Sequence, residues 1–433
     1  MNHINISASN QKRIVIIGAG FGGLELAKRL TNSAFQVVLI DKNNYHQFQP
    51  LFYQVATAGL EPSSIAFPLR KMFQKANNVF IRITTVDEVN TAEKRIETPL
   101  GALSYDYLVI AMGASTNYYG NENVARNAIP MKSVSEALYL RNHIFEDYEL
   151  ALTSDDTAVR QSYSDVVIVG GGPTGVELAG ALAEMKKYIL PKDYREMNIA
   201  EVDIYLIQSA DILLKGMSAE AAAKAEAFLL KLGVIIKKNT RVLDYDGETV
   251  TMNDGTSIRS KKVVWAAGIS GNTIKGLSAD CLAPGNRLIT NGLHQINGYT
   301  DVFALGDIAL CKEEKFPNGH PQVAQVAIQM AKNLAKNLIK NQNNSFEYND
   351  LGSMATVGRN HAVVDLPHFR FQGFFAWLVW LFVHLFAIVG VKNKIFVFLN
   401  WVWNYFTYDQ SLRLIIKPFS RKVAAEKMEG AVK

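Results

Sequence analysis

Apolar runs that end in a glycine-rich turn occur twice along the chain of 433 residues. The first is RIVIIGAGFGGLELAKRL, at 13–30, and the second is DVVIVGGGPTGVELAGALAEM, at 165–185. In each, a β-branched run precedes the turn and a helix-type pattern follows it, and another apolar run comes next, at 37–41 and 202–208. A strand, a glycine turn, a helix and a second strand form a βαβ unit, so the pattern predicts an α/β fold with two Rossmann-like domains.

Other parts of the pattern extend these units. Three further strands are expected to end at small residues, at 107–114, 262–269 and 301–307. In open α/β sheets, ligands lie at the carboxyl ends of strands, where small residues let the backbone come close. A long helix is expected to begin at Pro321, with apolar residues at 323, 326, 330 and 334.

The last sixty residues differ from the rest of the chain. Seventeen residues at 374–390 contain one polar side chain, His384, and a second apolar segment follows at 395–408. A helix needs about 20 apolar residues to cross a bilayer, and the second segment has only 14. We therefore expect two helices that lie in one leaflet with their apolar sides down. A spanning hairpin and a buried core or dimer interface remain alternatives. We interpret His384 as a packed, hydrogen-bonded side chain.

Charge and cysteine content argue against a nucleic-acid partner and against a metal site. The net charge is +5, and no long run of Lys and Arg accompanies it, so we expect no nucleic-acid partner. The two cysteines, Cys281 and Cys311, form no CxxC motif and no metal-type cluster with histidine, so we expect structural thiols and no metal site. The N-terminus shows no apolar signal segment, so we expect the chain to stay in the cytoplasm or on the cytoplasmic side of a membrane.

The first glycine-rich turn has the spacing of a dinucleotide site. Gly18, Gly20 and Gly23 give G-x-G-x-x-G between a strand and a helix, and Asp41 ends the next strand. Such glycines allow the tight turn, the approach of a pyrophosphate and close helix packing, while the helix N-terminus attracts phosphate. Asp41 is suited to bind the hydroxyls of an adenosine ribose.

The second turn repeats this spacing with Gly170, Gly172 and Gly175, but its second strand ends at Gln208 instead of an acid. A neutral amide does not repel a 2′-phosphate, so we expect weak discrimination between NADH and NADPH. Glu177 follows in the first turn of the helix. It is either a surface acid favoured by the helix dipole or a carboxylate that faces the groove between two nucleotides.

The chain resembles the two-dinucleotide-binding-domain flavoproteins, and within them the type II NADH:quinone oxidoreductases. The resemblance rests on GAGFGG, GGGPTGVE, the segment at 41–60, TDVFALGD and PQVAQVAIQ. It implies FAD in the first domain, NADH as substrate in the second, and a membrane quinone as acceptor. The absence of a cysteine before Cys281 separates the chain from disulfide reductases, and the positions of the cysteines do not match those of sulfide:quinone oxidoreductases.

The resemblance also implies domains and site residues. We expect an FAD-binding domain at 10–118 and 285–345, an NAD(H)-binding domain at 160–275, and a C-terminal helical membrane-association domain at 346–433. The expected FAD contacts are Gly18, Gly20, Phe21, Gly22, Gly23, Asp41, Lys42, His46, Val86, Ala111, Gly113, Asp307, Ala324 and Gln325. The expected NADH contacts are Gly170, Gly172, Gly175, Gln208 and Gly268. Glu177 matches the catalytic carboxylate of the family.

Two glutamines complete the expected site. Gln325 and Gln329 lie four residues apart, so they share one helix face. Because a carboxamide both donates and accepts hydrogen bonds, we expect both side chains to line a quinone pocket and to act in catalysis with Glu177. Two glutamines on a solvated helix face are the alternative.

We thus expect hydride transfer from NADH to FAD and electron transfer to quinone, without proton pumping. The expected partners are a bilayer surface and a second copy of the chain, on the cytoplasmic face of the inner membrane as a peripheral, monotopic protein. Two other functions remain open at this point. They are a soluble NAD(P)H:ferredoxin or rubredoxin-type reductase, and a membrane flavoprotein with mainly an interaction role.

Overall fold

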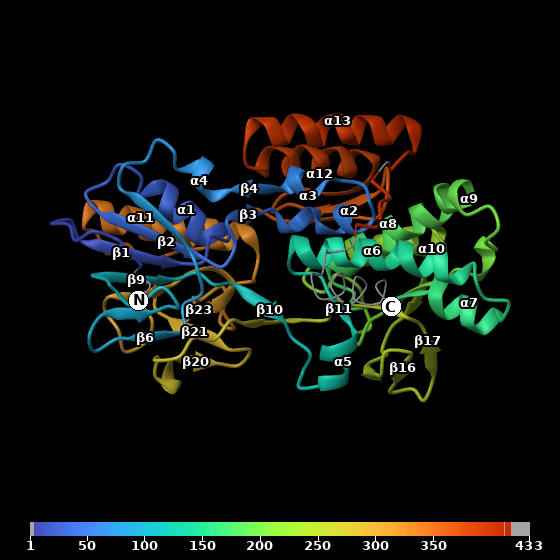
Figure 1. Ribbon diagram of the computed structural model, residues 1–433, viewed down its shortest axis with the longest axis horizontal. Helices are drawn as coiled ribbons and strands as arrows, with labels where there is room; N and C mark the ends of the chain where they lie inside the picture. The colour runs from blue at the N-terminus through green and yellow to red at the C-terminus, as the bar shows by residue number, and fades with distance from the viewer. Residues whose placement is uncertain (1–3, 411, 417–433) are drawn as a thin grey trace, which may run out of the picture.

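The computed structural model describes residues 4–410 and 412–416. One half of the molecule, on the left in Figure 1, is built on a parallel sheet of five strands in the order β22-β9-β1-β2-β5. The strands are β1 (Arg13–Ile17), β2 (Gln36–Asp41), β5 (Val79–Ile83), β9 (Tyr107–Ile110) and β22 (Val302–Ala304). The crossover helix α1 (Phe21–Arg29) packs against α11 (Ala324–Lys340). The predicted βαβ unit is confirmed, because β1 and β2 are parallel neighbours.

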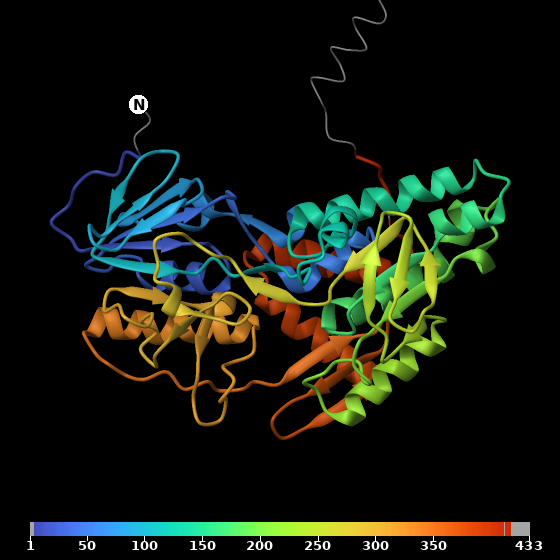
Figure 2. The same cartoon turned by 90° about the horizontal axis from the view of Figure 1, so that it is seen from below.

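The second half has a matching parallel sheet in the order β11-β18-β12-β13-β14. Its strands are β11 (Ile129–Pro130), β12 (Val166–Val169), β13 (Ile204–Ile207), β14 (Ile235–Lys237) and β18 (Lys262–Trp265). Helix α8 (Pro173–Tyr188) connects β12 to β13, and all four residues of β12 are buried. Helices α6 (Val134–Ala151) and α10 (Ala219–Lys231) lie in the same half, coloured green in Figure 2.

Smaller elements join and decorate these halves. An antiparallel ribbon of β10 (Ala114–Thr116) and β19 (Ile269–Gly271) runs between them. Segment 41–68 carries a second ribbon, β3 (Tyr45–Gln47) with β4 (Ala66–Pro68), and the short helices α2 (Phe52–Ala56) and α3 (Pro62–Ile65). The remaining small sheets are β6 (Glu88–Asn90), β7 (Arg95–Glu97) and β8 (Leu103–Ser104); β15 (Val242–Tyr245), β16 (Thr249–Met252) and β17 (Ser257–Arg259); and β20 (Leu282–Ala283), β21 (Arg287–Thr290) and β23 (Ala309–Cys311).

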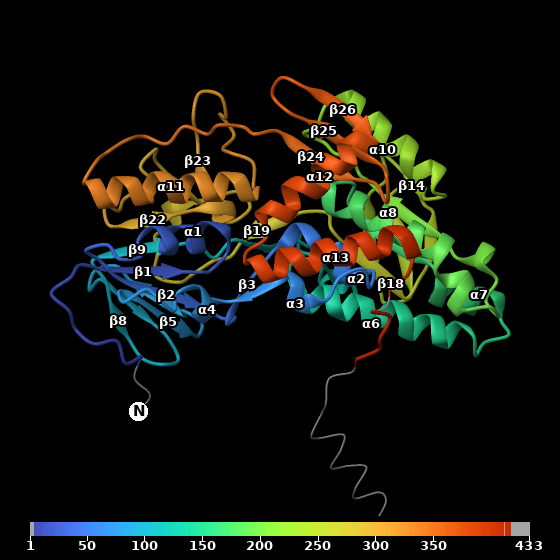
Figure 3. The same ribbon diagram turned by 90° about the horizontal axis from the view of Figure 1, so that it is seen from above.

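The C-terminal region combines a small sheet with two helices. Strands β24 (Ser353–Thr356), β25 (Ala362–Asp365) and β26 (Arg370–Gly373) form an antiparallel sheet that the sequence pattern did not predict. This sheet packs on α8 and α10. Helices α12 (Phe374–Ala387) and α13 (Val391–Thr407) follow and lie side by side over α2 and α3 (Figures 1 and 3).

Three helix boundaries differ from the expectation. The long helix begins at Ala324 and not at Pro321, because Val323 is still in an extended conformation. The first tail helix ends at Ala387, before the predicted Gly390. Gly390 has a φ of 86°, which breaks the helical path, and α13 then begins at Val391, four residues before the second apolar segment at 395–408.

The tail helices have two unlike faces. Ala376, Trp380, Ile388 and Val397 are buried and belong to the same core as α2 and α8. The opposite side exposes large apolar residues, namely Phe375, Phe382, Phe386, Ile395, Phe396, Phe398, Leu399, Trp403 and Phe406. None of the helices in the described part of the chain has the length and apolar character that crossing a bilayer requires.

Candidate active site

The first glycine-rich loop is shaped by close backbone contacts. Gly18 has a φ of 101°, and a Cβ atom there would lie 2.3 Å from the carbonyl oxygen of Ala111. A Cβ on Gly23 would lie 1.9 Å from the oxygen of Gly18. At Gly20 a Cβ would meet no atom within 4 Å. The loop therefore needs two of its glycines for packing, and it leaves open space at Gly20, at the N-terminus of α1, where a pyrophosphate fits.

Asp41 and His46 brace the same loop. The Asp41 carboxylate accepts hydrogen bonds from the backbone N–H groups of Ala19 and Asn43, each at 2.7 Å. Burial raises the pKa of Asp41 above its usual value. The Nδ1 atom of His46 lies 2.9 Å from the carbonyl oxygen of Ala19, so Nδ1 carries a proton. Burial lowers the pKa of His46 to about 4, and the ring is neutral near pH 7.

The other residues expected at FAD follow the carboxyl ends of the same parallel strands. Ala111 and Gly113 come after β9, Val86 after β5, and Asp307 after β22. Gly113 has a φ of 66° and faces open space. The Asp307 carboxylate lies 3.8 Å from the ammonium group of Lys132, and burial raises its pKa. Gly22 and Phe21 begin α1, Lys42 is exposed beside Asp41, and Ala324 begins α11.

These residues fit FAD. A phosphate-sized opening lies at a helix N-terminus, an acid ends β2, and small residues lie at the same sheet edge. We expect these residues to hold the cofactor.

The second loop repeats the first. Gly170 has a φ of 113°, and a Cβ there would lie 2.5 Å from the oxygen of Ala266. A Cβ on Gly175 would lie 1.9 Å from the oxygen of Gly170, while Gly172 faces open space. This loop also offers room for a pyrophosphate, at the N-terminus of α8.

Gln208 and Gly268 have neighbours that the sequence did not reveal. The Gln208 carboxamide accepts a hydrogen bond from the N–H of Gly171 at 3.1 Å and donates one to the oxygen of Ile212 at 3.2 Å. A Cβ on Gly268 would lie 2.2 Å from the hydroxyl of Tyr119, which donates a hydrogen bond to Ala267 at 2.7 Å. Tyr119 thus covers Gly268, and a nucleotide at this strand end would meet the tyrosine.

Glu177 is not a surface acid. It lies in α8 with only 7% of its surface exposed, and the backbone N–H of Thr356 donates a 3.4 Å hydrogen bond to its Oε1. Burial raises the pKa of Glu177 to about 8, and the nearby indole of Trp380 acts in the opposite direction. The Trp380 N–H is buried and has no partner within strict hydrogen-bond geometry. Near pH 7 this site therefore holds a protonated carboxyl group.

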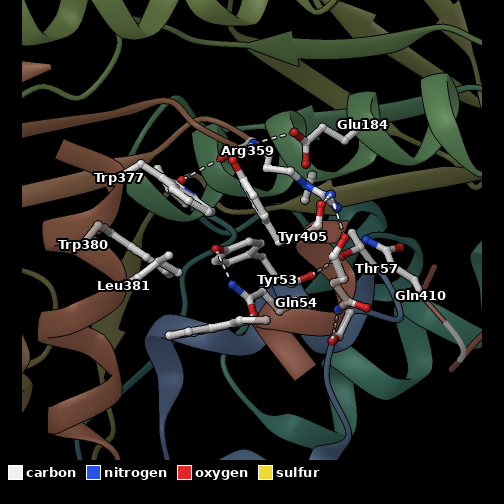
Figure 4. A pocket seen from close by; sticks show the side chains of 16 residues that line it. Tyr53, Gln54, Thr57, Glu184, Arg359, Trp377, Trp380, Leu381, Tyr405 and Gln410 are labelled. Atoms are coloured by element: carbon white, nitrogen blue, oxygen red, sulfur yellow. Dashed lines mark hydrogen bonds between the residues drawn. The ribbon is translucent and has the colours of Figure 1, made fainter. Parts of the chain in front are cut away.

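A cavity of about 100 Å³ lies beside Glu177, between α2, α8, the turn after β24, and both tail helices (Figure 4). Aromatic side chains form much of its wall. Its lining residues are Tyr53, Gln54, Thr57, Gly59, Ala181, Glu184, Thr356, Gly358, Arg359, Trp377, Trp380, Leu381, Trp401, Asn404, Tyr405 and Gln410. Glu177 itself is behind this wall, in contact with Thr356.

Hydrogen bonds connect the cavity to the tail. The indole N–H of Trp401 donates to Oε1 of Gln54 at 2.7 Å, and Nε2 of Gln54 donates to the hydroxyl of Tyr53 at 2.8 Å. The hydroxyl proton of Tyr53 is thereby left to donate elsewhere. Burial raises the pKa of Tyr53 well above its usual value, so the hydroxyl stays protonated.

Gln325 and Gln329 do not line this cavity. Gln325 donates a hydrogen bond to the oxygen of Gly352 at 3.0 Å and accepts one from the N–H of Leu351 at 3.2 Å. Gln329 pairs in the same way with the oxygen and N–H of Asn349, at 2.8 and 3.0 Å. Both carboxamides thus hold the segment that leads from α11 to β24. That they line a quinone pocket stays a prediction, and these backbone hydrogen bonds give both carboxamides a holding role as well.

Two simpler expectations are confirmed. His384 is packed against Trp380, with ring centroids 3.9 Å apart, and its Nδ1 lies 2.8 Å from the oxygen of Trp380. Cys281 and Cys311 are buried, free thiols.

Comparison with known proteins decides the family. Residues 12–331 match the model of the pyridine nucleotide-disulphide oxidoreductases, and residues 351–408 match the NDH2 C-terminal domain. The type II NADH:quinone oxidoreductase Ndh of Mycobacterium tuberculosis is 37% identical over 408 residues, which are 90% of this chain and 87% of that protein. The chain belongs to the type II NADH:quinone oxidoreductases.

Other comparisons agree with this family. The Staphylococcus aureus type II NADH:quinone oxidoreductase is 28% identical over 82% of this chain and 90% of its own. The structure of NDH2 from Plasmodium falciparum in complex with NADH has a TM-score of 0.86, covers 94% of this chain and 100% of its own, and is 20% identical. A ferredoxin reductase from Rhodopseudomonas palustris has a TM-score of 0.66 at 17% identity, over 83% of each chain. These structural matches concern the fold.

Sequence reasoning missed the cavity residues of this type II oxidoreductase. Glu184 and Arg359 are 175 residues apart, and the Arg359 N–H donates to the Glu184 carboxylate. One residue in the sequence could have indicated this contact. Gly180 lies in the middle of the continuous helix α8, where a glycine is unfavourable. A Cβ there would lie 2.6 Å from the N atom of Gly358, so the glycine makes room for the turn after β24.

Proposed function

We propose that this chain oxidises NADH and reduces a membrane quinone by way of FAD, without proton pumping. NADH and quinone are the two substrates that the name of its family gives. One observation carries the proposal. An aromatic cavity lies between the helix of the second nucleotide loop and two tail helices whose outer face is apolar and exposed. A quinone is a flat, lipid-soluble molecule, so it is suited to reach such a cavity from a bilayer.

The protein's residues position the reaction. A bound FAD would supply the redox chemistry, the transfer of two electrons between NADH and the second substrate. The first glycine loop and Asp41 hold one nucleotide, and the second loop holds the other. Glu177 lies at the start of α8 and carries a proton near pH 7, and Tyr53 offers a hydroxyl donor in the cavity. Gln325 and Gln329 fix segment 349–352, which continues into the strand that bonds Glu177.

We also propose that the apolar outer face of α12 and α13 lies on the bilayer, at the cytoplasmic face of the inner membrane. Exposed phenylalanine and tryptophan side chains support this, because they favour the interface between lipid and water. The sequence offers Arg413, Lys417, Arg421 and Lys422 as basic residues that could meet anionic headgroups. Arg413 instead pairs with Asp193 and Asp409, and the other three lie outside the described residues.

A homodimer is the expected assembly. Mass photometry of the protein in detergent and in lipid nanodiscs tests it, and a single mass of one chain in both would contradict it.

The soluble ferredoxin-type reductase is the second candidate. The fold fits it, but the cavity against the tail and the exposed apolar face favour quinone. The central experiment is to purify the full chain, record its absorbance spectrum, and add NADH and then a soluble quinone without oxygen. We expect a flavin spectrum that NADH bleaches and quinone restores. A colourless protein, or restoration only by an iron–sulfur protein, would refute the proposal.

Gln208 leads to a prediction on the donor. Because its carboxamide is neutral, we expect kcat/KM for NADH to exceed that for NADPH by less than about a thousandfold, roughly 4 kcal/mol. Steady-state rates with both nucleotides and a fixed quinone concentration measure this ratio. Gln208→Glu should increase it, because a carboxylate repels the 2′-phosphate.

A further inference from the structure

Glu184 is a second carboxyl group at the cavity that the proposed mechanism does not use. It lies on α8 seven residues after Glu177, which is two helical turns or about 10 Å along the axis. Unlike Glu177, it lines the cavity and is only partly buried (Figure 4). It therefore combines contact with the cavity and partial contact with solvent.

The surroundings of Glu184 suit an acid that gains and loses a proton. The backbone N–H of Arg359 donates to its Oε1. The Arg359 guanidinium is held over the ring of Tyr408 at 4.0 Å and by the oxygen of Asn404 at 2.7 Å, and its charge acts on Glu184. Lys187 on α8 and Tyr53 on α2 are the other titratable groups whose charges interact with this carboxyl.

The reaction of the family requires such a group. Its balance is NADH + H⁺ + quinone → NAD⁺ + quinol. The hydride brings two electrons and one proton, so one further proton per turnover must come from water. Glu177 is buried and is not among the residues that line the cavity, so an acid that does line the cavity is better placed to pass this proton to a molecule bound there.

We propose that Glu184 delivers this solvent proton to a quinone oxygen in the cavity; the assignment rests on the proposed function of the cavity as the quinone site. In this step the O–H bond of the carboxylic acid breaks and an O–H bond to the quinone oxygen forms. The electron pair stays on the carboxylate, next to Arg359, until the carboxylate takes a proton from water at its exposed side. Burial raises the pKa of Glu184, which favours the protonated form before the step.

The test compares Glu184→Gln and Glu184→Asp with Glu196→Gln, a matched change at an exposed glutamate. Three rates are measured in full-length protein with FAD bound: bleaching by NADH, reoxidation by a soluble quinone, and reoxidation by ferricyanide, which takes electrons without protons. Thermal melts and flavin absorbance check that each variant is folded and loaded.

For Glu184→Gln we expect an unchanged bleaching rate and an unchanged ferricyanide rate. Its quinone rate should fall by about a hundredfold, the low end of what a general acid contributes. Glu184→Asp and added acetic acid should each restore part of the quinone rate, and the solvent deuterium isotope effect of Glu184→Gln should be larger than that of the native protein. Glu196→Gln should match the native protein throughout.

A quinone rate of Glu184→Gln equal to that of the native protein would overturn the inference, and so would equal losses with quinone and ferricyanide. If the native protein itself does not reduce quinone, the proposed function fails, which is a separate result. If Glu184→Gln does not fold, Glu184→Asp tests the inference in its place. Its quinone rate should be lower than that of the native protein, and its ferricyanide rate should be unchanged. If both rates are unchanged, the inference is overturned.

Discussion

Glu177 shows how burial converts an ordinary acid into a neutral group. In the folded chain its pKa is about 8, against an ordinary value of 4.5. The folded state therefore holds a proton that the unfolded state releases. The stability from this group is complete below the unfolded pKa and is lost as pH rises through the folded pKa.

Glu177→Gln should thus gain stability relative to the native protein as pH rises, because glutamine cannot ionise. We expect the difference in melting temperature to grow between about pH 5 and about pH 9. Thermal melts of both proteins at each pH measure it. The variant should keep its flavin spectrum and reduce quinone more slowly. A pH-independent difference would show that the carboxyl group is ionised in the folded protein.

The two glutamines of α11 lead to a prediction of a different kind. Gln329→Leu removes both hydrogen bonds to Asn349, each worth about 1 kcal/mol, so the melting temperature should fall. Rates with quinone and with ferricyanide should change by the same factor if Gln329 acts only by holding the backbone. If the rate with quinone falls and the rate with ferricyanide does not, Gln329 contacts the quinone.

At the scale of elements, the glycine turns were predictable and the cavity was not. The loops at Gly18 and Gly170 could be predicted because each strand, turn and helix forms one continuous segment, at 13–29 and 166–188. The strands β24–β26 were missed, since only Ala355, Thr356 and residues 362–364 are buried in them and the pattern is short. The pairing of Glu184 with Arg359 arises only when the turn after β24 docks on Gly180.

The tail helices were read correctly as two-faced, and the outer face gives a clear test. Phe382→Glu and Phe406→Glu change side chains that are 62% and 77% exposed. Each should weaken binding to anionic lipid vesicles by about tenfold or more, because a buried phenylalanine contributes about 1.5–3 kcal/mol. Flotation of the protein with vesicles measures this. Leu230→Glu, on α10 and 54% exposed, is the matched control and should bind as the native protein does.

At the scale of the whole molecule, the tail belongs to the core. Trp380 and Val397 are buried in the same cluster as α2 and α8, and Gly390 lies so close to Phe67 that a Cβ would be 2.4 Å from its ring. Deleting residues 374–433 should therefore expose this core and give aggregated protein. Soluble yield and light scattering measure the outcome. A soluble deletion variant with a native melting temperature would show that the tail is a separate anchor.

Segment 41–68 begins with Asp41 and His46 at the first glycine loop and ends at the ribbon on which the tail rests. Fewer than thirty consecutive residues therefore join the loop that we propose for FAD to the tail that we propose for the bilayer. A detergent that distorts the tail should therefore also disturb the proposed flavin site. The absorbance spectrum of the flavin should then depend on which detergent is used to extract the protein.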